Sequence, residues 1–229
     1  EHVSKAKKAQ SGFVPASALR PSYKYLLVDF NHLLYSGTKN INSLPAFLNF
    51  VYSCATKVCR PMTIEKAIYF ALDGSAPMAK VLEQRNRRKS ECIDVRRSVL
   101  FNGSSSPSAS AMELTPGTNL MNSVKHASSH ALCKYLTLAQ NPKLCGIVSG
   151  AEVPGEGELK LFQFLSTQAD RDKQSDQSAL VVTGDSDVLL FSLLSNYRNI
   201  DILRLAGRDS QLYEIEVLRK EIAKMFFVK

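Results

Sequence analysis

The chain has 229 residues, 45% of them hydrophobic, which is enough to bury one substantial core and indicates one large α/β domain. Its formal net charge of +8 points to a polyanionic partner, although charge alone does not separate nucleic acid from anionic lipid or an acidic protein. No uninterrupted apolar stretch reaches the ~18 residues needed to cross a bilayer, so we expect no membrane partner.

The cysteines and the N-terminal stretch give indications of the cellular compartment in which the protein acts. The five cysteines are odd in number and include no C-x-x-C pair, which favours a reducing, intracellular compartment and argues against a zinc site. Residues 2–28 carry Lys and Arg but no acid, as remnants of mitochondrial transit peptides and disordered basic arms both do. We predict a flexible basic arm over residues 1–22 and leave the compartment open between these interpretations. The apolar last residues, MFFVK, predict a domain that is incomplete at its C-terminus.

Apolar runs and turn signals then predict the elements in chain order. The expected strands lie at about 25–29, 67–72, 145–149, 179–183 and 200–205. The expected helices lie at about 44–58, 78–100 and 117–136. Between the second and third of these helices, the stretch FNGSSSPSASA at residues 101–111 predicts a flexible insert. The alternation of strands and helices predicts an α/β fold, a mostly parallel doubly wound sheet flanked by helices.

Four of the apolar runs end on acidic residues. Because the carboxyl ends of parallel strands meet at one edge of an open sheet, we expect these side chains to lie together. The six candidates are Asp29, Asp73, Glu156, Glu158, Asp185 and Asp187. Taken alone, an acid after a strand is often only a helix cap or a surface residue, and Asp185 is also placed to cap the helix DVLLFSLL.

Six carboxylates this close together cannot all stay ionised unaided. Either several pKa values rise, or a cation lies among the carboxylates. Hard oxygen ligands in this number suit Mg²⁺ or Mn²⁺, and we expect two ions. Hydrolysis of phosphodiesters is the usual chemistry of such a site.

The predicted helix at 78–100 carries a regular set of polar side chains. Lys80, Gln84, Arg87 and Arg88 are spaced i, i+4, i+7 and i+8 and therefore share one helical face, just beyond Asp73. Arg forks and a Lys ammonium on one face are suited to binding a phosphate. The alternative is an ordinary solvated basic face. The nearby carboxylates favour the phosphate site.

Five blocks follow one another along the chain: VDFNHLLYSG, ALDGSAPMAKVLEQRNRRK, LTPGTNLM, VPGEGELKLF and GDSDVLLFSL. In sequence and in order they resemble the first conserved region of the Xrn family of 5′→3′ exoribonucleases, and LYEIEVLRKEI resembles a later helix of that family. The resemblance implies an exoribonuclease N-terminal domain over residues 23–229, with a nuclease core of the PIN/FEN type. Family members act in the cytoplasm or nucleus.

The resemblance also implies roles for individual residues. The six acids listed above would be the metal ligands and catalytic residues. Lys80, Gln84, Arg87 and Arg88 would hold the 5′ monophosphate of a single-stranded RNA. Tyr35 stands where the family usually has a histidine that stacks on the terminal base, and its aromatic ring is expected to do the same.

Two further departures from the family pattern lead to alternatives. The family's last metal-binding aspartate belongs to a block beyond the last residue of this sequence, and its usual N-terminal segment is replaced by the basic arm. The first interpretation is a metal-dependent 5′→3′ exoribonuclease in RNA decay or processing. The second is a catalytically inactive, exonuclease-like subunit of a ribonucleoprotein assembly. A third, a flap endonuclease acting on DNA, is weakened by the family-specific blocks.

Overall fold

The computed structural model describes residues 7–9, 19–38, 43–76, 114–206 and 209–227, together with a few helical positions between 81 and 93. The predicted phosphate-binding residues Lys80, Gln84, Arg87 and Arg88 lie outside the described residues, as does the insert at 101–111.

A seven-stranded mixed sheet forms the centre of the domain, in the order β1-β7-β6-β5-β2-β3-β4. Five neighbouring strands run parallel: β2 (Ser22–Asp29), β3 (Thr63–Ala71), β4 (Cys145–Ser149), β5 (Ala179–Thr183) and β6 (Ile200–Ala206). Two antiparallel strands complete one edge: β7 (Asp209–Glu214) and β1 (Lys7–Ala9).

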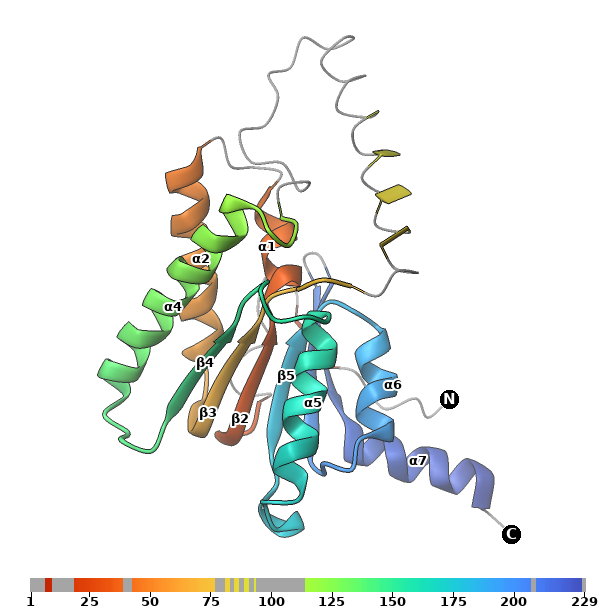
Figure 1. Cartoon of the computed structure of the whole chain (residues 1–229). Coiled ribbons are helices and arrows are strands. Elements are labelled where there is room, and N and C mark those ends of the chain that lie inside the picture. The colour runs from red at the N-terminus through yellow and green to blue at the C-terminus, as the bar shows by residue number, and fades with distance from the viewer. Residues whose placement is uncertain are drawn as a thin grey trace.

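Helices cover both faces of the sheet (Figure 1). On one face lie α1 (Phe30–Thr38), α2 (Leu44–Cys59) and α4 (Asn119–Ala139), and on the other lie α5 (Gly157–Ala169), α6 (Asp187–Leu194) and α7 (Ile215–Phe227). None of the described helices is both long and apolar enough to cross a bilayer.

The alternation of side chains along β2 explains why two cores form. Leu26 and Val28 pack into the core under α2 and α4, whereas Tyr25 and Leu27 pack into the core under α5 and α6. Strand β5, with the sequence ALVVT, is buried along its whole length, as expected for a central parallel strand.

This architecture confirms the predicted fold class, a mostly parallel doubly wound sheet. Strands β4 and β5 have the predicted bounds. The block LYEIEVLRKEI is not a helix throughout, because Leu212–Glu214 pairs with β6 and the helix begins only at Ile215. Within the stretch predicted as a flexible arm, Lys7–Ala9 pairs with β7.

Buried ion pairs hold the amino ends of the strands, opposite the predicted site. At the start of β6, Asp201 is 1% exposed. Its carboxylate accepts hydrogen bonds from Arg20 at 2.7 and 3.0 Å and from the Tyr23 hydroxyl at 2.8 Å. These partners satisfy both carboxylate oxygens, so the charge is compensated within the protein.

A second buried carboxylate at this end, Asp172, is compensated in the same way. The Lys66 ammonium lies 2.5 Å from its Oδ1 atom, and the Lys24 ammonium lies 3.8 Å from the same atom. The Tyr197 hydroxyl donates to Oδ2 at 3.4 Å. These bonds join the loop after α5 to the beginnings of β2 and β3.

Candidate active site

The predicted acids follow the carboxyl ends of neighbouring parallel strands. Asp29 is the last residue of β2, and Asp73 lies two residues beyond β3. Glu156 is the N-cap of α5, which follows β4, and Glu158 lies in the first turn of that helix. Asp185 comes two residues after β5. The parallel order of these strands is what brings residues so distant in the chain to one edge.

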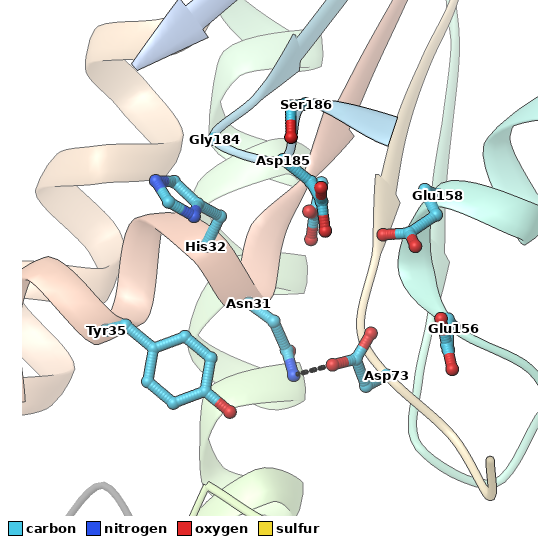
Figure 2. Close-up of a pocket in the computed structure, with 10 residues that line it drawn as sticks. Asn31, His32, Tyr35, Asp73, Glu156, Glu158, Gly184, Asp185 and Ser186 are labelled. Atoms are coloured by element: carbon cyan, nitrogen blue, oxygen red, sulfur yellow. Dashed lines mark hydrogen bonds between the residues drawn. The ribbon is translucent and has the colours of Figure 1, made fainter. Parts of the chain in front are cut away.

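Five of the six predicted acids line a single cavity of about 310 Å³. The acids are Asp29, Asp73, Glu156, Glu158 and Asp185, and the other lining residues are Asn31, His32, Tyr35, Gly184 and Ser186 (Figure 2). In this view the Asp73, Glu158 and Asp185 carboxylates border the same space. The structure therefore gathers most of the predicted cluster in one place.

The sixth predicted acid, Asp187, does not line this cavity. Its residue is exposed at the start of α6, and its backbone N–H donates to Asp185 Oδ1 at 3.0 Å. Asp185 therefore accepts a hydrogen bond from the first turn of α6, as the helix-capping alternative predicts, while it also lines the cavity. The role of Asp187 as a ligand stays a prediction.

Neutral hydrogen-bond donors fix the two central acids. Asn31 Nδ2 donates to Asp73 Oδ2 at 2.8 Å, and the Gly157 N–H donates to Asp73 Oδ1 at 2.8 Å. The Thr183 hydroxyl donates to Asp29 Oδ2 at 3.2 Å. These donors orient the carboxylates without adding a positive charge, while among the described residues the buried Lys160 ammonium interacts with the Asp73 charge through space.

A missing side chain at Gly157 leaves room between the two central acids. A Cβ atom at this position would lie 3.0 Å from Asp29 Oδ1 and 3.4 Å from Asp73 Oδ1. Both carboxylate oxygens therefore border the same small space. A side chain on residue 157 would fill it.

The electrostatics of the cluster follow from burial and like charge. Burial and then the neighbouring Asp73 charge raise the pKa of Asp29 to about 7, against the opposing effect of the Thr183 hydrogen bond. A bound cation would reverse this rise, because a cation stabilises the ionised form.

The residues of this cavity fit a hard divalent cation. The donor set is made of carboxylate oxygens, the space beside Gly157 is bordered by two of them, and Asn31 Oδ1 is buried with no hydrogen-bond partner among the described residues. Among the described residues, no three His, Cys, Asp or Glu side chains converge closely enough to enclose one ion. Mg²⁺ does not require such a cage, since it commonly keeps several waters and takes only one or two carboxylates.

Three residues of α1 line the cavity, and the sequence interpretation missed two of them. Tyr35 was expected in the site, but Asn31 and His32 were not, because the segment HLLYSG was not predicted as a helix. On α1 these side chains share the turn that follows Asp29. A helical interpretation of FNHLLYSG would have placed all three at the cavity.

His32 is held tightly at the edge of the cavity. Its Nε2 atom lies 3.1 Å from the Leu205 carbonyl oxygen, and burial lowers its pKa. A Cβ atom on Gly184 would lie only 1.7 Å from the His32 ring, so only glycine lets β5 lead past this ring toward Asp185. Tyr35 is partly buried on the same helix and lines the cavity (Figure 2).

Comparison with known proteins gives the class of this site. The sequence model of the XRN 5′-3′ exonuclease N-terminus matches residues 2–206, and the chain belongs to this family. The matched region includes the basic N-terminal stretch that we expected to be foreign to the family. It also includes all six predicted acids and the predicted phosphate-binding residues.

Individual relatives are similar at a moderate level. The chain is 30% identical to 5′-3′ exoribonuclease 1 of Schizosaccharomyces pombe over 80% of its length, and 28% identical to human 5′-3′ exoribonuclease 1 over 61%. It spans only 15% and 9% of those two relatives. Among solved structures, the catalytic core of Rad2 in complex with a DNA substrate matches with a TM-score of 0.46 at 16% identity, over 94% of this chain and 57% of that one.

Proposed function

We propose that this chain is the nuclease domain of a metal-dependent 5′→3′ exoribonuclease that acts on single-stranded RNA with a 5′ monophosphate. The observation that supports this proposal most strongly is the set of five carboxylates that line one cavity at the carboxyl edge of the sheet, within the region matched by the family. Such a set serves phosphodiester hydrolysis better than it serves binding alone, because clustered carboxylates repel the phosphates of RNA unless a cation lies between them.

The chain's own residues would prepare the site for a divalent ion. Asp29 and Asp73 would hold Mg²⁺ or Mn²⁺ together with Glu156, Glu158 and Asp185, and the ion would lower the pKa of a bound water and neutralise the scissile phosphate. Asn31 and the Gly157 N–H orient Asp73, and Thr183 orients Asp29. These bonds keep the ligands in place before substrate arrives.

The chemical step would be attack of water on the second phosphorus of the RNA. The bond from that phosphorus to the 3′ oxygen of the first nucleotide breaks, and a nucleoside 5′-monophosphate leaves. The shortened RNA again begins with a 5′ monophosphate, so the product is a substrate for the next cycle. Tyr35, on the rim of the cavity, would stack on the terminal base.

Selection of the 5′ end would fall to the basic helix. Lys80, Gln84, Arg87 and Arg88 share one face of the predicted helix and would form charge-assisted hydrogen bonds to one phosphate. A pocket that accommodates only one phosphate would exclude a triphosphate. Each such contact contributes about 1.5–3 kcal/mol, so losing one should cost about ten- to a hundredfold in discrimination.

The test compares decay of one RNA that carries a 5′ monophosphate, a triphosphate or a hydroxyl, in the presence of Mg²⁺. The parent chain should prefer the monophosphate, and Arg88→Ala should lose that preference. Lys89→Ala is the matched control, because Lys89 is an exposed neighbour on the same helix that lies outside the predicted set. Asp29→Asn controls for contaminating nucleases.

Three outcomes would contradict the proposal. Equal decay of all three RNAs would show that the basic helix is a solvated face. Shortening of the RNA from its 3′ end would show that the proposed 5′→3′ direction is wrong. RNA binding with no decay of any substrate would favour the non-catalytic subunit of a ribonucleoprotein assembly.

A further inference from the structure

Lys160 is buried in a place that disfavours a positive charge. It is 3% exposed, and it is the one Lys or Arg residue in the buried class among the described residues. It lies near the beginning of α5, where the helix dipole repels a cation, and burial lowers its pKa. A leucine would fill this position at lower cost, so the ammonium calls for an explanation.

The partners of the ammonium are backbone carbonyls rather than a carboxylate. Lys160 Nζ donates to the Leu72 oxygen at 2.7 Å and to the Gly150 oxygen at 3.0 Å. Leu72 directly precedes Asp73, and Gly150 opens the loop that leads to Glu156. One side chain therefore joins the two segments that carry three of the site's acids.

Further hydrogen bonds link the same two segments around the ammonium. The Gly74 N–H donates to the Gly155 oxygen at 2.9 Å, and the Gly155 N–H donates to the Ser75 oxygen at 3.0 Å. The Gly157 N–H reaches Asp73 Oδ1 at 2.8 Å. These bonds lie beyond the ends of β3 and β4, where the sheet no longer holds the chains together.

The backbones of the segment 72–75 and the loop 150–157 approach each other closely, so their relative position depends on these hydrogen bonds. A Cβ atom on Gly74 would lie 1.9 Å from the Val153 oxygen, so the two segments touch with no side chain between them. No hydrophobic packing of residue 74 can replace the polar links. A cationic donor bonded to two carbonyls is stronger than a neutral one, which suits it to this junction.

We propose that Lys160 is a positioning residue: it fixes the segment 72–75 against the loop 150–157 and thereby sets the Asp73 carboxylate relative to Glu156 and Glu158. It does not contact substrate. Its consequence for hydrolysis rests on the proposed function, whereas its effect on the geometry of these segments does not.

The test replaces Lys160 by methionine, which has a similar length and no charge, and measures native-state amide hydrogen exchange. Protection of the Gly74, Gly155 and Gly157 amides should fall by at least about tenfold, while protection of the β5 amides stays unchanged. Methionine removes the cost of the buried charge but leaves the Leu72 and Gly150 oxygens without this donor, so the loss of protection at these three amides should exceed any loss of global stability. Lys66→Met, at the opposite end of the sheet, is the matched control and should leave these three amides protected.

Steady-state kinetics on a 5′-monophosphorylated RNA give a second readout. Lys160→Met should lower kcat by about tenfold or more and leave KM within about twofold, because the groups proposed to bind the RNA end are untouched. If the methionine variant does not fold, Lys160→Gln carries the same expectations, since its shorter neutral amide cannot reach both carbonyls.

The outcomes separate the two proposals. A parallel loss of protection throughout the sheet would show a general stabilising role and overturn the positioning role, as would unchanged protection and kcat. If the parent chain cuts no RNA but Lys160→Met still loses protection only at these amides, the positioning role stands and the proposed function fails.

Discussion

Buried carboxylates at the two ends of the parallel sheet have different hydrogen-bond partners. At the amino end, Asp201 is bonded to Arg20 and Tyr23, and Asp172 is bonded to Lys66. At the carboxyl end, Asp29 and Asp73 have only neutral hydrogen-bond partners among the described residues. The first arrangement pairs each acid with a cation of the protein, although burial still raises the pKa of Asp201, whereas the second holds negative charge that an external cation would compensate.

The comparison also separates stability from function. Crowded acids of like charge lower stability, so a buried cluster of them marks a candidate functional site. The paired acids connect strands and loops far apart in the sequence, as in the Arg20–Asp201 bond across 181 positions. Changes at the two ends should therefore affect different measurements.

The largest expected effect is on activity at the carboxyl end. Asp29→Asn removes a proposed ligand and should slow RNA decay by about 10²–10³-fold or more. Its Tm should stay the same or rise, because one of several mutually repelling carboxylates is gone. Decay rates and thermal melts of the two proteins check this. Parental decay by a purified variant would contradict the assignment.

A second prediction concerns pH in the metal-free protein. Burial and Asp73 raise the pKa of folded Asp29 to about 7, whereas an unfolded aspartate titrates near ~3.9. The folded state binds this proton more tightly, so its stabilising effect is complete below pH ~4 and is lost as pH rises through about 7, at up to about 1.4 kcal/mol per pH unit.

Thermal melts between pH 5 and 8 in EDTA check this prediction. The parent should lose stability toward pH 8, and Asp29→Asn should lack that part of the loss. Mg²⁺ should reduce the loss in the parent, because a cation stabilises the ionised carboxylate. Identical pH profiles of parent and variant would show that Asp29 does not titrate in this range.

A third prediction tests substrate contact at the carboxyl end. Tyr35→Ala should weaken RNA binding by about 1–3 kcal/mol, the value of stacking one base, while Tyr35→Phe should retain most of the affinity. Binding of a short 5′-monophosphorylated RNA in Ca²⁺ measures this. Equal losses in both variants would point to the hydroxyl group instead of the ring.

At the amino end the expected effect is on stability alone. Asp201→Asn removes charge-assisted bonds and should lower the free energy of unfolding by about 1.5–3 kcal/mol, toward the lower value because the Arg20 side chain is 37% exposed. Decay per folded molecule should be unchanged. Denaturant melts and activity normalised to folded protein check both parts, and loss of activity without loss of stability would contradict the division between the two ends.

Local sequence patterns predicted one end of the sheet better than the other. Apolar runs that end on acid identified β2, β3, β4 and β5 and placed five acids at one edge, because strand direction alone decides where those residues lie. The paired end was not predicted, since no local pattern joins Arg20 to Asp201. The β6–β7 hairpin was missed because the helical appearance of LYEIEVLRKEI obscured the alternation in Leu212–Glu214.

The positions of individual side chains depend on the folded geometry, which the spacing of residues in the sequence does not determine. Asp187 shares the block GDSD with Asp185, yet the start of α6 leaves it exposed outside the cavity. Lys160 lies in the block VPGEGELKLF, but only the folded chain shows that its ammonium joins the Leu72 and Gly150 carbonyls.

The central claim is that the clustered acids at the carboxyl end hold a divalent ion. The most direct test is anomalous diffraction from crystals of the chain soaked in Mn²⁺, with Asp29→Asn crystals soaked in parallel. The account predicts an Mn²⁺ peak bounded by the Asp29 and Asp73 carboxylates in the parent, and a weaker or absent peak in the variant. A parent crystal with no Mn²⁺ in this cavity, or with an equal peak in both proteins, would contradict it.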